Sequence, residues 1–258
     1  QLLVDGTEST TATVAGGYLS QLAGAWSQGL RLQTIDRRGW PNRLPRVESQ
    51  PRVFYNPDLR SMWHMAPALL ALVLTVLMQN LTALSIARER ELGTLEQLVM
   101  TPIRPAELLL GKLLPYGLVG LADAAVVTGI VVGVLGVPLR GSLLVLSAST
   151  VVFLFATLGL GLVISTVSAN QQQAQLTNFF LTFPSLLLSG FIFPIDNLPV
   201  ALKPFSYAVP MRYFLEVVRG VFLRGSGFDV LWPQLLGLLG LGVLFFTIGA
   251  RRFHKRLD

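Results

Sequence analysis

The chain has 258 residues, of which 52% are hydrophobic and only 13% are charged. An ordinary soluble domain carries about 25% charged residues, so this composition argues against a soluble globular protein and favours a membrane protein. In such a chain the net charge of +6 points to anionic lipid headgroups rather than nucleic acid. The absence of cysteine excludes disulfides, thiolate nucleophiles and cysteine-ligated metal sites.

Residues 1–61 differ in composition from the rest and predict part of a small α/β domain. LLVD before Gly6 is typical of a strand entering a turn, and residues 10–32 can form a helix. The Arg-, Pro- and Gly-rich stretch 36–51 predicts a loop, and 52–55 predicts a second strand ended by Asn56-Pro57. Because the chain opens with Gln1 and this domain looks incomplete, we expect further sequence upstream.

Five apolar stretches are long enough to cross a bilayer, which needs about 20 residues per helix. They are residues 63–87, 108–137, 142–168, 176–193 and 231–250. Backbone groups in lipid must bond to one another, so these stretches predict helices and an all-α membrane protein. Five buried helices of a soluble bundle are the weaker alternative, because most of the five lack a polar stripe.

The tail RRFHKRLD follows the last stretch directly and is dense in cations, which predicts a cytoplasmic C-terminus. Counting back, segments 169–173 and 88–104 are also cytoplasmic, and segments 1–61 and 195–230 lie outside. The arginines of the 195–230 loop count against this orientation.

A charged segment lies between the first two apolar stretches. Leu92, Leu95, Leu98 and Val99 share one face of a helix predicted over 88–101, and Arg88, Glu89, Arg90, Glu91 and Glu96 occupy the rest. Thr101-Pro102 ends this helix. It can lie on the membrane surface and dock into a soluble partner, or it can be an ordinary polar loop helix.

A second helix is predicted in the 195–230 loop, after Pro210. Its apolar face carries Met211, Phe214, Leu215, Val218 and Phe222, and its charged face carries Arg212, Glu216 and Arg219. The spacing allows Glu216 to pair with either arginine. Two interpretations remain open: an interfacial or re-entrant helix, and a surface helix with a solvated charged face.

Other polar residues give weaker indications. Asp123 lies near the middle of the second apolar stretch, where a charge must face protein or water, so it is a possible intramembrane site or a packing partner. His64 and His254 lack neighbours at metal-binding spacing, so no metal site is expected. Glycine pairs suited to close helix packing are Gly129/Gly133, Gly159/Gly161 and Gly237/Gly240. A polar cluster at one membrane boundary comprises Asn170, Gln171, Gln172, Gln173 and Gln175.

The pattern R-E-R-E-x-G-T-x-E-Q-L, followed by T-P-x-R-P-x-E-L-L-x-G-K, resembles the signature of the type-2 ABC exporter permeases. The segment 188–220 is similar to the extracellular re-entrant hairpin of that family. LLVDGTEST and the following helix resemble the extracytoplasmic insert of its drug-exporter-like branch. Since family members have six spans, the resemblance implies that a first span precedes Gln1.

The resemblance also implies roles for residues and partners. The residues that match the coupling helix, which sits in a groove of the ATPase subunit, are Arg88, Glu89, Arg90, Glu91, Gly93, Thr94, Glu96 and Gln97. ATP and Mg²⁺ are expected on that partner, because Gly111-Lys112 here is followed by Leu113 and forms no P-loop. A second permease, identical or related, and a periplasmic adaptor are the other expected partners.

The function expected from these features is that of a permease subunit in a bacterial inner membrane, without catalysis of its own. It exports an amphipathic or apolar cargo such as a drug or lipid. The main alternative is a proton- or ion-coupled secondary transporter that uses Asp123. An intramembrane enzyme is the poorest option, because only Asp123 is clearly at that depth.

Overall fold

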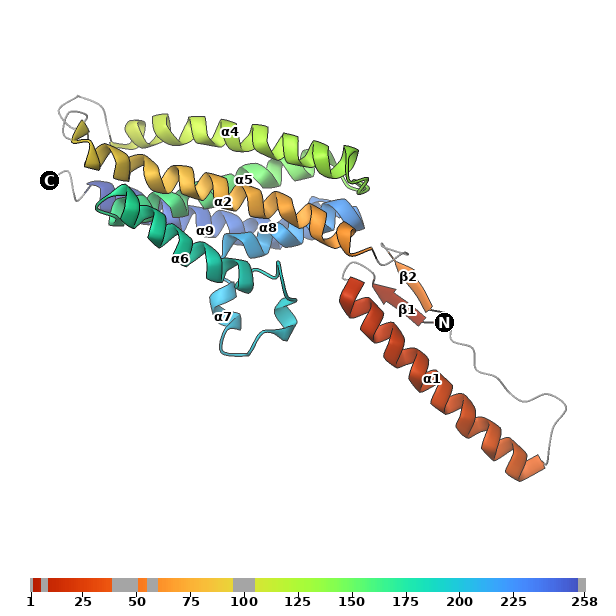
Figure 1. Ribbon diagram of the computed structural model, residues 1–258. Coiled ribbons are helices and arrows are strands. Elements are labelled where there is room, and N and C mark those ends of the chain that lie inside the picture. Colours follow the sequence, from red (N-terminus) through yellow and green to blue (C-terminus); the bar gives the residue numbers. More distant parts are fainter. Residues whose placement is uncertain (1, 6–8, 39–50, 55–59, 95–104, 255–258) are drawn as a thin grey trace. The chain divides into compact units, whose positions relative to one another are not determined.

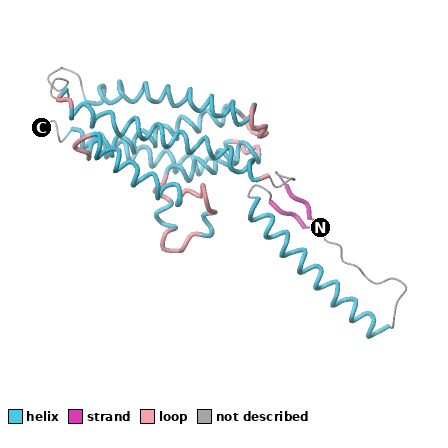
Figure 2. The backbone as a smooth tube through the Cα atoms, in the orientation of Figure 1, coloured by secondary structure: helices cyan, strands magenta, loops and turns pink. Residues whose placement is uncertain are grey.

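The computed structural model describes residues 2–5, 9–38, 51–54, 60–94 and 105–254. The chain divides into two compact units, Gln1–His64 and Met65–Asp258. Helices dominate both units, and two short strands occur in the first (Figure 2).

The first unit has a strand–helix–strand order. Strand β1 (Leu2–Asp5) pairs in parallel with β2 (Pro51–Phe54). Parallel neighbours require a crossover connection, and helix α1 (Ser9–Arg38) lies within it. The loop expected from residue 36 is wrong at its start, because residues 36–38 continue α1.

The second unit contains four helices, among the described residues, that are long and apolar enough to span a membrane. They are α2 (Ser61–Glu91), α4 (Pro105–Gly133), α5 (Leu143–Val167) and α9 (Phe228–His254). Ser142 caps α5 by accepting a hydrogen bond from the Leu144 amide at 3.2 Å. These helices confirm the expected all-α membrane protein.

The fifth expected span is not among them. Helix α6 runs from Gln171 to Leu188, so its first turn is glutamine-rich and its apolar part is shorter than predicted. It ends where Gly190 adopts a left-handed φ of 84°. A sequence pattern that counted apolar residues to 193 missed this break, because the residues after the break are also apolar.

Helix α5 is central to the second unit. It packs most extensively on α9 and also contacts α4, α6 and α8 (Figure 1). Gly161 lets α2 approach α5, since a Cβ there would lie 2.6 Å from Thr82 Cβ. Gly159 faces α9, where a Cβ would lie 3.2 Å from the Phe246 amide nitrogen. The close packing expected at this glycine pair is therefore present, whereas a Cβ at Gly129 or Gly133 would meet nothing within 4 Å among the described residues.

The 195–230 segment contains four short helical pieces. They are η1 (Ile195–Asn197), α7 (Lys203–Ser206), α8 (Pro210–Arg219) and the π-helix η2 (Gly220–Arg224). The apolar face of α8 is buried against α5 and α9, and Phe214 stacks on Phe153 with ring centroids 4.1 Å apart. The apolar face of α8 therefore belongs to the core of the second unit, and both interpretations of its charged face remain predictions.

Arg212 and Arg219, on the charged face of α8, bind groups outside that helix. Arg212 lies 3.8 Å above the Tyr207 ring and donates to Ser206 Oγ. Arg219 donates to the Gly190 carbonyl at 3.1 Å, which ties α8 to the end of α6. Glu216 is exposed.

The connection between α4 and α5 is bonded to η2. The Arg140 and Gly141 amides donate to the carbonyls of Phe222 and Val221 at 3.2 and 2.9 Å. The Arg140 guanidinium adds a bond to the Leu223 carbonyl at 3.1 Å. This contact, the α4–α5 clasp, joins two segments far apart in sequence.

Within the second unit, several helix ends meet at one end of the bundle. The end of α2, the end of α5, the start of α6 and the end of α9 gather there (Figure 1). Segments expected on one side of the membrane thus lie together.

Candidate functional site at the end of helix α2

The predicted coupling helix does not begin as a separate helix at residue 88. Arg88–Glu91 form the last turn of α2, continuous with the apolar span. Gly93 then adopts a φ of 70° and donates from its amide to the Arg90 carbonyl at 3.2 Å, which ends the helix. Glu96, Gln97 and the remainder of the predicted helix lie outside the described residues. The prediction of a separate helix from residue 88 was wrong, because a run of charged residues does not by itself interrupt an α-helix.

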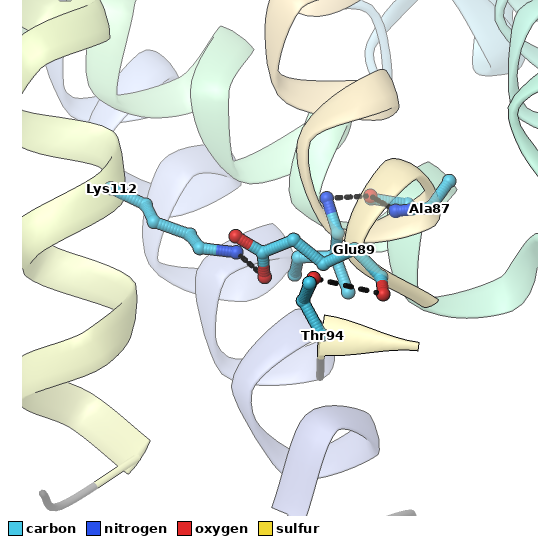
Figure 3. Close-up of polar contacts among 6 residues, drawn as sticks. Ala87, Glu89, Thr94 and Lys112 are labelled. Carbon is cyan, nitrogen blue, oxygen red and sulfur yellow. Dashed lines mark hydrogen bonds and ion pairs between the residues drawn. The ribbon is translucent and has the colours of Figure 1, made fainter. Parts of the chain in front are cut away.

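Glu89 joins this last turn to α4. Its carboxylate forms an ion pair with Lys112, whose side chain reaches across from α4 (Figure 3). The side chains are 24% and 18% exposed, so water screens the attraction only in part. Thr94 Oγ1 donates to the backbone carbonyl of Glu89 at 3.2 Å.

Arg90 and two neighbouring amides join the same turn to α5. Arg90 donates through Nη1 to the Ser168 carbonyl at the end of α5. One turn earlier in α5, the buried Ser165 Oγ accepts from the amides of Ile86 and Ala87 at 3.0 and 3.1 Å (Figure 3). The end of α2 is thus bonded to the end of α5 at two levels.

Glu91 joins the turn to α6. Its Oε2 accepts from both the backbone amide and the side-chain amide of Gln171, each at 3.1 Å. The start of α6 is itself held by its cap: Asn170 accepts from the Gln173 amide at 2.8 Å, and Gln173 accepts from the Ala169 amide at 2.7 Å. Sequence placed Gln171–Gln173 at a membrane boundary, where they could contact the ATPase or simply be solvated, and it did not predict the contact with Glu91.

We call Glu89, Arg90 and Glu91, with their partners Lys112, Ser165, Ser168 and Gln171, the α2 terminal cluster. Arg88, Glu91 and Leu92 are all exposed, but Glu91 accepts two hydrogen bonds from Gln171, whereas Arg88 and Leu92 lie outside the cluster. One helical turn therefore presents two directions: three charged residues hold α4, α5 and α6, and Arg88 with Leu92 faces outward. The cluster consists of hydrogen bonds and one ion pair that hold these helix ends together.

Sequence reasoning missed Lys112, Ser165 and Ser168 as members of this cluster. Lys112 had one available signal, since a lysine in an apolar helix is expensive unless it is paired or near the membrane surface. Ser165 and Ser168 had none, because small hydroxyl residues are common in packed membrane helices.

Asp123 lies on α4, away from the cluster in sequence and on a half-buried position. Its Oδ2 is buried and finds no hydrogen-bond partner among the residues that the structure describes. The neighbouring Gly120 packs tightly, since a Cβ there would lie 2.6 Å from Leu154 Cδ2.

Comparison with known proteins places this architecture in a family. Residues 29–223 match the family model described as ABC-2 type transporter. The chain is 37% identical over its full length to a probable multidrug ABC transporter permease of Escherichia coli, YbhS, and covers 67% of that protein.

Two further relatives come from the same organism. The probable multidrug ABC transporter permease YbhR is 34% identical over 98% of this chain, and 66% of YbhR is covered. The inner membrane transport permease YhhJ is 31% identical over the full chain, with 68% of YhhJ covered.

The family match, these identities and the four apolar helices agree with the resemblance noted in the charged motif. They also agree with a multi-pass membrane protein of the inner-membrane permease type. The chain belongs to the ABC-2 type transporter family and is a transmembrane subunit of an ABC transporter.

Proposed function

We propose that this chain is the permease of an ATP-driven exporter and that the end of α2 receives the force supplied by a separate ATPase. One observation carries the proposal: a single turn, Glu89–Glu91, is bonded to α4, α5 and α6. A push on that turn cannot move α2 alone. The exposed Arg88 and Leu92 leave a face of the same turn open to a partner.

The mechanism is mechanical. Closure of the ATPase displaces the turn, the α2 terminal cluster passes the displacement to three helices, and these stiff helices tilt. Helix α2 extends through 31 residues without a break, so its far end moves with the near end. ATP and Mg²⁺ bind to the ATPase, and this chain performs no covalent chemistry.

The cargo that best fits the helices is amphipathic or apolar, such as a drug or a lipid. Helix α6 supports this, because Phe179, Phe180 and Phe183 are exposed on it. A face of this kind suits either a cargo path or a second permease, and we propose that two permeases, identical or related, enclose the path between them.

The finer architecture follows from the same proposal. Helix α6 with the following hairpin serves as the remaining crossing, since it carries the chain away from the end where α2 and α9 terminate (Figure 1).

The unit Gln1–His64 is an extracytoplasmic domain. Its helix α1 exposes Val14, Tyr18, Leu22 and Trp26 at intervals of four residues, which supports contact with a periplasmic adaptor protein.

A secondary transporter driven by protons or ions is the second candidate, and the buried, unpartnered Oδ2 of Asp123 favours it. One experiment separates the two. The full-length permease and its ATPase are reconstituted in vesicles, with either an intact ATPase or one that cannot hydrolyse ATP. Export that stops with the inactive ATPase supports the exporter. Export that continues and follows an imposed proton gradient supports the secondary transporter.

A further inference from the structure

A small, partly open cavity lies in the second unit, where α2, α5, α6 and the start of α8 meet. Its walls include Thr75, Gln79, Phe153, Thr157, Ser185 and Met211. It offers about 10 Å³ of room for the centre of a water molecule. That is about the minimum that a single buried water needs.

Gln79 supplies a hydrogen-bond donor to this cavity. Its side chain is 2% exposed, and its Nε2 finds no partner among the residues that the structure describes. A buried donor left without a partner destabilises the folded state, and water cannot reach it from lipid. The site therefore calls for an acceptor within hydrogen-bond distance of Nε2, which the described residues do not supply directly.

The hydroxyl groups supply acceptors. Thr75, Thr157 and Ser185 donate their protons to carbonyls four residues earlier, at Ala71, Phe153 and Leu181, over 2.6, 2.9 and 2.7 Å. Each hydroxyl oxygen keeps a lone pair for another donor. A cation fits poorly, because the Gln79 amide presents N–H groups and the walls carry no charged side chain.

We propose that this cavity binds one resident water molecule, which accepts a hydrogen bond from Gln79 Nε2 and donates to hydroxyls of Thr75, Thr157 or Ser185. The water joins α2 to α5 and α6 at membrane depth. The water can donate to one hydroxyl or to another, so these helices can shift slightly while the water stays hydrogen-bonded to both sides. This inference does not depend on the proposed function.

The test is hydroxyl-radical footprinting of the full-length protein in lipid nanodiscs, read by mass spectrometry. Radiolysis of a bound water oxidises the side chains that touch it, even where bulk solvent is excluded. Met211 lines the cavity and is 1% exposed; Met78 is equally buried at 1% but does not line it. Met211 should be oxidised several-fold faster than Met78.

Two variants link the signal to the proposed ligands. Gln79→Leu removes the donor, and Thr157→Val removes one acceptor with nearly unchanged shape. Both should lower the rate of Met211 oxidation toward that of Met78. If Gln79→Leu does not fold, Thr157→Val alone tests the proposal. Equal rates for the two methionines in the unmodified protein would overturn the proposal. Fast Met211 oxidation in folded Gln79→Leu would also overturn it, because it would mean entry of bulk solvent.

Discussion

Lys112 on α4 forms an ion pair with Glu89 on the last turn of α2, so the two helices that flank the charged segment are tied at its base. We propose that the segment between them meets the ATPase. A force on that segment thus acts on two helices that are already joined. We propose that displacement is transmitted through this ion pair.

Neutralising this pair should weaken coupling more than stability. Glu89→Gln or Lys112→Gln removes the ion pair, and because both side chains are partly exposed the loss of stability should be about 1 kcal/mol or less. The ratio of cargo exported to ATP hydrolysed should fall several-fold in reconstituted vesicles. The reversed pair, Glu89→Lys with Lys112→Glu, should recover most of that ratio. If both single variants keep the original ratio, the pair has no role in transmission.

Arg88 tests the outward face of the same turn. Its side chain is exposed and lies outside the α2 terminal cluster, so Arg88→Glu should change the unfolding free energy by no more than about 0.5 kcal/mol. Reversing this charge should reduce the amount of ATPase that co-purifies with the permease in detergent. Undiminished co-purification would show that the ATPase binds elsewhere.

Glu91 and Gln171 test the link to α6. Glu91→Lys removes the acceptor of two 3.1 Å hydrogen bonds and places a cation beside the amide donors. The expected result is ATP hydrolysis that continues while export falls, with the spans still folded. Gln171→Ala is the matched partner variant, since it removes one of the two bonds and should give a smaller loss. Normal export by both variants would contradict a role for this link.

Sequence patterns predicted the spanning helices well because lipid leaves the backbone few choices. The caps Ser142 and Ser168 coincide with the expected ends of the third span. The patterns were wrong about where two helices end. Helix α6 ends early, before Gly190, and α2 continues through Arg88–Glu91. No periodicity signals either event.

The candidate site was predicted in its residue types but not in its connections. The motif picked out Glu89, Arg90 and Glu91 and assigned their charges to a partner protein. The structure engages all three within the chain, with Lys112, Ser168 and Gln171. Such pairings between residues about 20 and 80 positions apart depend on helix packing, which one sequence does not encode in any short pattern.

Gly93 tests how α2 is ended. Its φ of 70° is a left-handed conformation that costs an alanine about 1–2 kcal/mol, and a Cβ there would meet nothing within 4 Å among the described residues. Gly93→Ala should therefore lower the thermal stability through backbone strain alone. Gly111→Ala is the matched control, because it also meets open space but has no left-handed φ. The strain account fails if both substitutions have the same effect.

A substitution at Asp123 tests whether this residue only packs within the membrane or also takes part in transport. Asp123→Asn keeps the shape and removes a charge whose insertion costs about 2.5–3.5 kcal/mol at a helix centre. The variant should assemble normally and still export in an ATP-dependent manner. Loss of transport with intact assembly and intact ATP hydrolysis would instead make Asp123 a site of proton or cargo binding.

The α4–α5 clasp offers a test at the other end of the second unit. A Cβ on Gly141 would lie 2.8 Å from the Val221 carbonyl oxygen, so Gly141→Ala must push η2 away from the connection between α4 and α5. Overpacking of this kind typically costs about 1–3 kcal/mol. Because π-turns often occur at functional positions, export should fall along with stability. Gly129→Ala on α4 is the control, since its Cβ would meet nothing within 4 Å among the described residues and should leave both quantities nearly unchanged. Equal thermal stability of the two variants would mean that η2 moves freely, and the clasp would then hold nothing in place.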